Sequence, residues 1–262
     1  MITSSSNPQM KWIVQLNKKA KTRYEQRVFV VEGIKICQEI PSEWIEKVYL
    51  SESFFRDPKR MEQWQDYPHE VVSERVFQAV SDTKTPQGIL CLVKMPKYSL
   101  EDILGKNPHI LILEDIQDPG NLGTMLRTGE GAGITGVIMS KSTVDLFHPK
   151  VIRSTMGSLF RVPFYIAEDL SETLRELKEK GISLYAAHLE GKLLYQEPDY
   201  RKSCGFLIGN EGNGLSQGIA ELADAYIRIP MEGNVESLNA AIAAALLMYE
   251  TNRQRFCTEH NR

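Results

Sequence analysis

The sequence predicts an α/β protein in two parts: a small N-terminal α/β domain and a larger domain with a parallel sheet covered by helices on both faces. The chain has 262 residues, which suits two domains of ordinary size. From residue 109 onward, short apolar runs alternate with segments of helical spacing, a pattern typical of a parallel sheet. A short polar stretch with a proline, residues 94–99, separates the parts, so we place the domains at 1–95 and 96–262.

In the first part, strands are expected at 29–33, 47–50 and 89–93, with helical patterns between the first two and a turn-rich loop at 81–88. In the second part, strands are expected at 110–113, 136–139, 183–187, 204–208 and 226–229, and helices at 123–131, 149–159, 170–180 and 217–223. Ligands of such sheets bind beyond the carboxyl ends of the strands. The loops to inspect therefore follow Leu113, Ile208 and Ile229.

The last helix is expected to begin near Ala240. Residues 240–248 carry almost no polar side chain on any face. Such a helix is buried all round or pressed against another subunit.

Overall charge gives no support for a nucleic-acid partner, because 31 Lys and Arg residues face 34 Asp and Glu residues. A local cluster is the exception. Between residues 9 and 28 the only acid is Glu25, and this run is either a solvated helix face or a surface for nucleic acid. Its basic members are Lys11, Lys18, Lys19, Lys21, Arg23 and Arg27.

The four cysteines are scattered, with no Cys-x-x-Cys pair and no histidine at ligand spacing. We therefore expect neither a metal site nor a disulfide framework. Met1 is followed by polar residues, and no apolar run approaches the ~18 residues that a membrane span needs. We expect a cytoplasmic protein without a membrane partner.

The first loop runs from Glu114 through a Pro-Gly turn into a helix, and Asn121 suits the N-cap of that helix. Arg127 follows six residues later, about one and two-thirds turns along the helix. It is either a solvated arginine or a side chain that reaches back to the loop.

The second loop, residues 209–216, holds three glycines and Glu211 directly after an apolar strand. Glycines let backbone approach a ligand closely. A flexible turn is the alternative, but turning the chain needs neither three glycines nor an enclosed acid.

The third loop, residues 229–239, leads into the last helix and carries Ser237 and Asn239. Both side chains suit contact with a ligand. Ser237 is also a favoured N-cap residue, and the alternative interpretation is that it caps the last helix, with Glu236 in the first turn. Capping and ligand contact are compatible.

Residues 131–136 fit the pattern G-x-G-x-x-G, the dinucleotide-binding fingerprint of dehydrogenases. That fingerprint follows a strand and opens a helix, whereas here the glycines end a helix and precede a strand. We interpret them as a helix C-terminus and turn.

Taken in order, the three loops resemble the signature motifs of the SpoU (TrmH-like) branch of the SPOUT RNA methyltransferases. The matching segments are N-L-G-T-M-L-R at 121–127, I-G-N-E-G-N-G-L-S at 208–216 and I-P-M-E-G-N-V-E-S-L-N-A-A at 229–241. The first ninety-odd residues, with F-V-V-E-G-I-K at 29–35, are similar to the substrate-binding domain of many members, which resembles a ribosomal RNA-binding protein. Under this resemblance the basic run would contact RNA phosphates.

The resemblance implies S-adenosylmethionine bound at Gly209, Ile229 and Leu238, a C-terminal trefoil knot and a homodimer. It also implies methyl transfer to a ribose 2′-hydroxyl, with the nucleotide pocket formed by Arg127, Asn121, Glu211, Ser237 and Asn239. We favour ribosomal RNA over transfer RNA as the substrate, because the additional domain suggests an extended RNA surface. A non-catalytic RNA-binding or assembly factor is the alternative from another class.

The proton acceptor in this reaction stays open. Arg127 is the family's favoured base, but a guanidinium with a pKa above ~12 is a poor base. We prefer an orienting role for Arg127, with the RNA phosphate or a water taking the proton. Glu211 is either a base or a side chain that holds the loop through backbone N–H groups.

Overall fold

The computed structural model describes residues 1–259, which form two compact units. The N-terminal unit comprises residues 1–97 and 145–160, and the large unit comprises residues 98–144 and 161–259. The sequence-based limits did not anticipate that 145–160 packs with the N-terminal unit. The reason is an ion pair, because the buried guanidinium of Arg23 binds the carboxylate of Asp145.

The N-terminal unit is built on a four-stranded sheet in the order β1-β4-β2-β3. Strand β4 is antiparallel to both of its neighbours, and β2 and β3 are parallel. The sequence missed β3, which is short and begins with two polar residues. The strands are β1 Val28–Glu32, β2 Ile45–Ser51, β3 His69–Val72 and β4 Ile89–Lys94.

The N-terminal unit also contains short helices, and a buried apolar cluster that includes Met10 and Ile13 of the first and Phe77 of the sixth joins these two to the sheet. The helices are α1 Pro8–Lys18, α2 Ala20–Gln26, α3 Ile34–Gln38, α4 Glu52–Phe55, α5 Pro58–Met61, α6 Glu74–Val80 and α9 Pro149–Thr155, with 3-10 turns η1 Ser42–Trp44 and η2 Ser158–Phe160.

The large unit contains a seven-stranded sheet in the order β7-β6-β5-β10-β8-β11-β9, and every neighbouring pair is parallel. The predicted parallel sheet is confirmed. The sequence missed β7 and the two-residue β9, both at the edges of the sheet. The strands are β5 His109–Leu113, β6 Gly136–Ser140, β7 Phe164–Ala167, β8 Ser183–Ala187, β9 Leu193–Leu194, β10 Cys204–Ile208 and β11 Ala225–Arg228.

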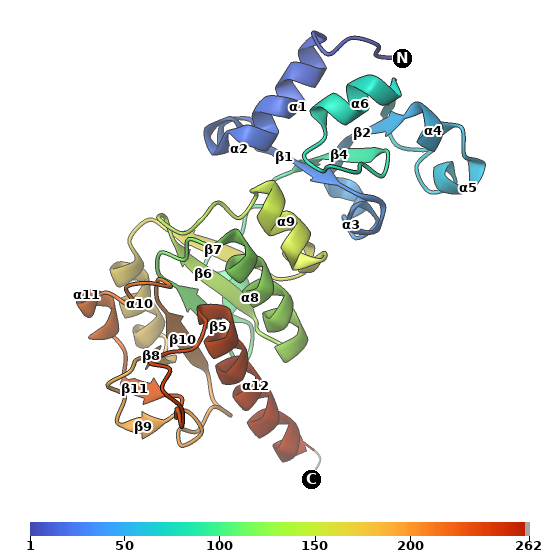
Figure 1. Cartoon of the computed structure of the whole chain (residues 1–262). Coiled ribbons are helices and arrows are strands. Elements are labelled where there is room, and N and C mark those ends of the chain that lie inside the picture. Colours follow the sequence, from blue (N-terminus) through green and yellow to red (C-terminus); the bar gives the residue numbers. More distant parts are fainter. Residues whose placement is uncertain (260–262) are drawn as a thin grey trace. The chain divides into compact units, whose positions relative to one another are not determined.

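Helices cover both faces of this sheet (Figure 1). Ile110 and Ile112 of β5 face one way and join a cluster with α7 Glu101–Leu104, α10 Leu170–Glu179 and α11 Gln217–Ala220. Side chains alternate along a strand, so Leu111 and Leu113 face the other way. On that side α8 Pro119–Ala132 and α12 Ala240–Glu259 pack against each other, and α12 contacts β5 and β10.

Helix α8 ends as the sequence predicts. Gly133 follows its last residue with a left-handed φ of 76°, the geometry of a helix-terminating glycine. The glycines at 131–136 therefore close a helix and are no dinucleotide fingerprint.

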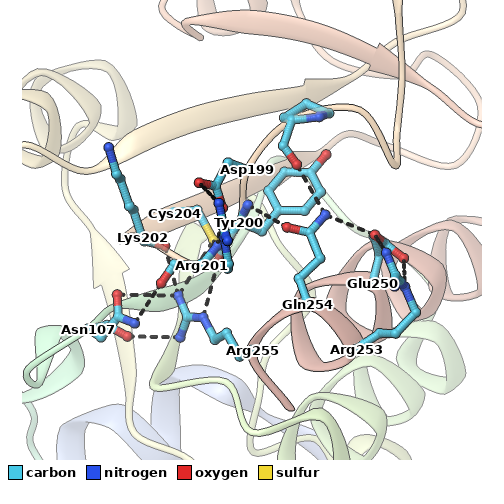
Figure 2. A network of polar contacts seen from close by, with 11 residues as sticks. Asn107, Asp199, Tyr200, Arg201, Lys202, Cys204, Glu250, Arg253, Gln254 and Arg255 are labelled. Atoms are coloured by element: carbon cyan, nitrogen blue, oxygen red, sulfur yellow. Dashed lines mark hydrogen bonds and ion pairs between the residues drawn. The ribbon is translucent and has the colours of Figure 1, made fainter. Parts of the chain in front are cut away.

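Arg255 of α12 ties the amino ends of β5 and β10 together (Figure 2). Its guanidinium donates to the carbonyls of Asn107, Pro108, Tyr200 and Lys202 at 2.9–3.1 Å. These carbonyls precede the two strands, and that of Pro108 also accepts a hydrogen bond from the backbone N–H of Cys204. One side chain thus supplies a donor to each of the four carbonyls.

Helix α12 is not buried all round. Ala244, Leu247 and Met248 are fully buried, but Ile242 is 50% exposed and Tyr249 is 49% exposed. Of the two alternatives for this helix, complete burial is therefore wrong for the isolated chain. Among residues 1–259, no helix combines the length and apolar character that crossing a bilayer would require.

Candidate functional site

The three predicted loops follow β5, β10 and β11, and hydrogen bonds connect them. Strands β5 and β10 are neighbours in a parallel sheet, so the loops after them leave the same edge. Edges of this kind are where α/β sheets bind ligands.

Glu211 connects the second loop to the first. Its Oε2 accepts a hydrogen bond from the backbone N–H of Gln117 at 3.0 Å, and its Oε1 accepts from the N–H of Asp118 and from Nδ2 of Asn121, each at 3.0 Å. Burial raises the pKa of Glu211, but these hydrogen bonds outweigh burial and the net shift is downward. A carboxylate with a lowered pKa is a weak base, so its geometry suits holding the loop.

Asn121 connects the first loop to the third. Its Oδ1 accepts a hydrogen bond from Nδ2 of Asn239 at 3.0 Å. Together with the bond to Glu211, this forms a continuous chain from the second loop through Asn121 to the start of α12. The three side chains come from sequence positions up to 118 residues apart.

Both helix caps differ from the sequence interpretation. Asp118, and not Asn121, caps α8, because its Oδ1 accepts from the N–H of Asn121 at 2.9 Å. Asn239, and not Ser237, caps α12, because its Oδ1 accepts from the N–H groups of Ala241 and Ile242. Pro119 occupies the first helical position of α8, so the cap is the residue before it, Asp118. The side-chain amide of Asn121 therefore bridges the loops instead of capping the helix.

The glycine-rich loop is closed at its base. Asn210 and Gly214 exchange two backbone hydrogen bonds of 3.0 and 2.9 Å. A Cβ at Gly209 would lie 2.1 Å from the backbone of Gly214 and Leu215, so no side chain fits there. The backbone of this loop therefore depends on glycine at 209.

Several polar residues that the sequence analysis missed hold these loops. Both carboxylate oxygens of Glu114 bind Ser216, at 2.7 Å to the N–H and 2.6 Å to the hydroxyl. Asp115 has a left-handed φ of 56°, and its carbonyl accepts from Nδ2 of Asn210 at 2.9 Å. In the sequence, the feature that could have identified Glu114 and Asp115 is that they directly follow an apolar strand.

Arg127 and Ser237 are exposed. Within residues 1–259, neither side chain takes part in a hydrogen bond or ion pair. Arg127 lies one and two-thirds turns beyond Asn121 on α8. Its guanidinium therefore has all of its donors free for a ligand.

The third loop has backbone suited to a cofactor. Residues 229–239 adopt no helix or strand, and Ile229 and Leu238 are half-buried. Among the described residues, no hydrogen bond engages the backbone of 230–238. These main-chain N–H and C=O groups, together with the confined backbone at Gly209, fit a ligand that is bound through main-chain contacts.

The basic run lies on α1 and α2, and most of it is exposed. Lys11, Lys18, Lys19, Lys21 and Arg27 face solvent. Arg23 does not: its side chain is 2% exposed and is held by Asp145 and by the carbonyls of Leu16 and Asn17. The expected RNA contact at Arg23 is therefore wrong, because the guanidinium is buried and bound to protein acceptors.

Comparisons with known proteins agree with this arrangement. A family model described as the SpoU rRNA Methylase family matches residues 108–249, and one described as the MRM3-like substrate binding domain matches residues 7–91. The chain is 36% identical to the 23S rRNA (guanosine(2553)-2′-O)-methyltransferase RlmP of Bacillus subtilis, over 95% of this chain and 97% of that protein.

Solved structures are similar over nearly the whole chain. The AdoMet-bound rRNA methyltransferase from Sinorhizobium meliloti is 31% identical with a TM-score of 0.84, covering 96% of this chain and 97% of that one. The SpoU methyltransferase AviRb from Streptomyces viridochromogenes is 25% identical with a TM-score of 0.86, covering 96% and 99%.

Proposed function

The chain belongs to the SpoU rRNA methylase family, and we propose that its three hydrogen-bonded loops form the active site of an RNA methyltransferase. The protein is an S-adenosylmethionine-dependent RNA 2′-O-ribose methyltransferase. The observation that carries the site assignment is the chain Glu211–Asn121–Asn239, which joins all three loops.

Gly209, Ile229 and Leu238 hold the cofactor in this proposal. The support is the open main chain of the third loop and the glycine-dependent backbone of the second. S-adenosylmethionine supplies a methyl group on a sulfonium, a strong electrophile, so the protein's task is alignment and removal of one proton.

Arg127 orients the target nucleotide. Its exposed guanidinium lacks a protein partner among the described residues and can bind a phosphate or ribose oxygen bidentately. Charge that develops on the 2′-oxygen is stabilised by such a donor. Ser237 and Asn239 complete the lining of the nucleotide pocket. Like Arg127, the Ser237 side chain has no partner among the described residues.

Glu211 is a positioning residue. It is occupied by two backbone N–H groups and the amide of Asn121, and its pKa is lowered. It therefore fixes the first loop, and the proton of the 2′-hydroxyl goes to the RNA phosphate or a water.

Substitution of Arg127 by Lys tests this assignment, because it keeps the charge and removes the planar fork. We expect kcat to fall by about 10²–10³-fold with unchanged cofactor affinity in calorimetry. The control is Arg175→Lys, an exposed arginine on α10. Near-normal turnover of Arg127→Lys would rule out an orienting role, and failure of the wild type to bind S-adenosylmethionine would favour a non-catalytic RNA-binding or assembly factor.

Ribosomal RNA is the proposed substrate in preference to transfer RNA. The relative with 36% identity is named a 23S rRNA methyltransferase, and the chain carries the additional N-terminal unit. Mapping 2′-O-methyl sites in total RNA from cells with and without the gene tests this. A site that disappears from transfer RNA alone would overturn it.

Lys11, Lys18, Lys19, Lys21 and Arg27 supply phosphate contacts in this proposal. Deletion of residues 1–95 does not isolate these contacts, because it also removes Arg23, the buried partner of Asp145. Charge reversal of Lys18, Lys19 and Lys21 is sharper. We expect weaker RNA binding and a smaller salt slope, by about 0.7–0.9 per lost contact. Reversal of exposed Lys106, Lys192 and Lys202 is the control, and equal loss there would refute the assignment.

A homodimer through α12 is also proposed. Ile242, Leu246, Tyr249 and Phe256 are exposed at intervals that place them on one side of the helix. Sedimentation of Ile242→Glu/Leu246→Glu should show monomers where the wild type shows dimers. A monomeric wild type would overturn the proposal.

A C-terminal trefoil knot belongs to the same proposal. Strand β10 follows β8 in the chain but lies between β5 and β8 in the sheet, and the chain then returns from β11 to α12 beside α8. This order supports threading of the C-terminal segment. A crystal structure of the cofactor complex with an unthreaded path would refute it.

A further inference from the structure

The N-terminal unit carries a cavity of about 340 Å³ that the reaction above does not use. Ser51, Ser53, Arg60, Glu74, Phe77 and Gln87 are among the residues that line it. The volume lies within the range of small-ligand sites, about 300–1,000 Å³. The cavity belongs entirely to the segment matched by the substrate-binding family model.

The cavity has fixed walls. Gly88 has a left-handed φ of 84°, and a Cβ there would lie 2.6 Å from the hydroxyl of Ser51. Gln87 is held by the backbone N–H of Ile34, which donates to its Oε1 at 2.7 Å. Ser51 is 1% exposed and its hydroxyl lies 3.1 Å from that of Ser53. These contacts hold the site in shape before any ligand arrives.

Glu74 gives the cavity an acceptor. Its Oε1 accepts a hydrogen bond from the N–H of Ser53 at 2.7 Å, and hydrogen bonds from the Ser53 hydroxyl and N–H lower its pKa. The carboxylate is therefore ionised at neutral pH and only accepts hydrogen bonds. Its side chain is exposed, so its remaining acceptor positions are open to a ligand.

The other lining groups add apolar surface and a cation. Phe77, which is 2% exposed, Ile34 and Pro86 are the apolar side chains that line the cavity. The Arg60 side chain is 48% exposed and its Nε lies 3.2 Å from Asp57. A flat ligand with hydrogen-bond donors on its edge and a nearby negative charge matches this set.

We propose that this cavity binds one unstacked base of the substrate RNA and that Glu74 selects bases with an exocyclic amino group. The proposal rests on the RNA-methylating function above. Proteins read single-stranded RNA by accommodating splayed-out bases on apolar side chains and hydrogen-bonding their edges. A carboxylate accepts from the amino group of cytosine, whereas uracil presents a carbonyl oxygen at that position. Arg60 meets an adjacent phosphate.

Fluorescence anisotropy of the full chain with labelled hexacytidylate and hexauridylate tests this. We expect the wild type to prefer hexacytidylate by roughly tenfold, and Glu74→Gln to lose most of that preference. Gln still accepts from Ser53, so the loop is preserved. The control is Glu43→Gln, an exposed glutamate outside the cavity. Equal binding of the two RNAs by the wild type, or an unchanged preference in Glu74→Gln, overturns the proposal.

Filling the cavity gives a second, independent test. Ser53→Trp should weaken binding of hexacytidylate by roughly tenfold, whereas Ser42→Trp, on an exposed turn outside the cavity, should not. Unaltered binding by Ser53→Trp would contradict the assignment. Cytidine monophosphate that binds as tightly as hexacytidylate would make the ligand a free nucleotide and also overturn it.

Methyl transfer separates this proposal from the function on which it rests. Glu74→Gln should raise KM for RNA and leave cofactor affinity unchanged in calorimetry. A wild type that binds S-adenosylmethionine but methylates no RNA refutes the proposed function. A wild type that methylates RNA, with Glu74→Gln matching it in KM and base preference, refutes only the cavity.

Discussion

At each end of the large sheet, one charged side chain forms hydrogen bonds with several backbone groups, and the charge is opposite at the two ends. At the carboxyl end, Glu211 accepts hydrogen bonds from backbone N–H groups, and at the amino end Arg255 donates to backbone carbonyls. Around Glu211 the surroundings are open, with Arg127 exposed, whereas His109 and Tyr200 at the other end are 1% and 0% exposed. Backbone groups of the loops need hydrogen-bond partners at both ends of the sheet. At the open carboxyl end, polar groups also remain accessible to a ligand.

Removal of the Arg255 guanidinium is expected to have the largest effect. Arg255→Met keeps much of the aliphatic stem but removes the donor to the carbonyls of Asn107 and Lys202 and one of the two donors to that of Pro108. We expect a loss of about 3 kcal/mol in the free energy of unfolding, measured by chemical denaturation. Arg56→Met, which removes an ion pair with Glu52 in the N-terminal unit, should cost under about 1 kcal/mol. Equal losses would show that the network does not stabilise this end.

Glu211→Gln probes the opposite end. Glutamine has one acceptor oxygen where Glu211 uses two, so its NH2 group would face backbone donors. We expect kcat/KM to fall by about 10²-fold through misplacement of the first loop, with little change in thermal stability. The matched control is Glu179→Gln on the exposed end of α10. A Glu211→Gln variant that loses stability but retains activity would show that Glu211, like Arg255, stabilises the fold and does not support the reaction.

The pH dependence of stability probes the buried end. Burial and the nearby charge of Arg255 lower the pKa of His109 to about 3, so the folded protein holds the neutral imidazole. Its contribution to stability is complete above the unfolded pKa of about 6.5 and is lost as the pH falls toward 3, by at most about 1.4 kcal/mol per pH unit. In His109→Phe this part of the pH dependence should disappear from denaturation curves. An identical slope between pH 6.5 and 4 in wild type and variant would contradict it.

Asn239 is expected to give a small change in stability. Asn239→Ala removes the cap of α12 and should cost about 1 kcal/mol. Asn239→Asp keeps the capping oxygen and loses the amide donor to Asn121. We therefore expect Asp to retain stability in thermal unfolding while both variants lose activity. Full activity of the Asp variant would show that the bridge to Asn121 has no role in the reaction.

The sequence was most informative about the strands and the three loops. Strands β8 and β10 begin and end where predicted, and the apolar run of β10 is bounded by Ser203 and Gly209. Strand β9 was missed because two residues at a sheet edge carry no periodic pattern. The caps were misplaced by two or three residues, because Asn, Asp and Ser are all favoured there and only the backbone path decides among them.

The basic run shows the limit of residue type as a guide. Six cations within seventeen residues predicted one RNA surface, but Arg23 turns inward to Asp145. Its partner lies 122 residues away in a segment that no local pattern assigns to the N-terminal unit.

The sequence by itself determined the parallel sheet and the positions of the three loops, because apolar period, glycine and polar residue types are local properties, and the motifs in those loops indicated the methyltransferase family by resemblance. Only the tertiary structure decided which side chains hold the site. Glu211, Asn121 and Asn239 meet because the sheet order places their strands and helices at one edge, and the strands that bring them there are far apart in the chain. Hydrogen bonds between distant residues depend on that packing, and no spacing in the sequence specifies them.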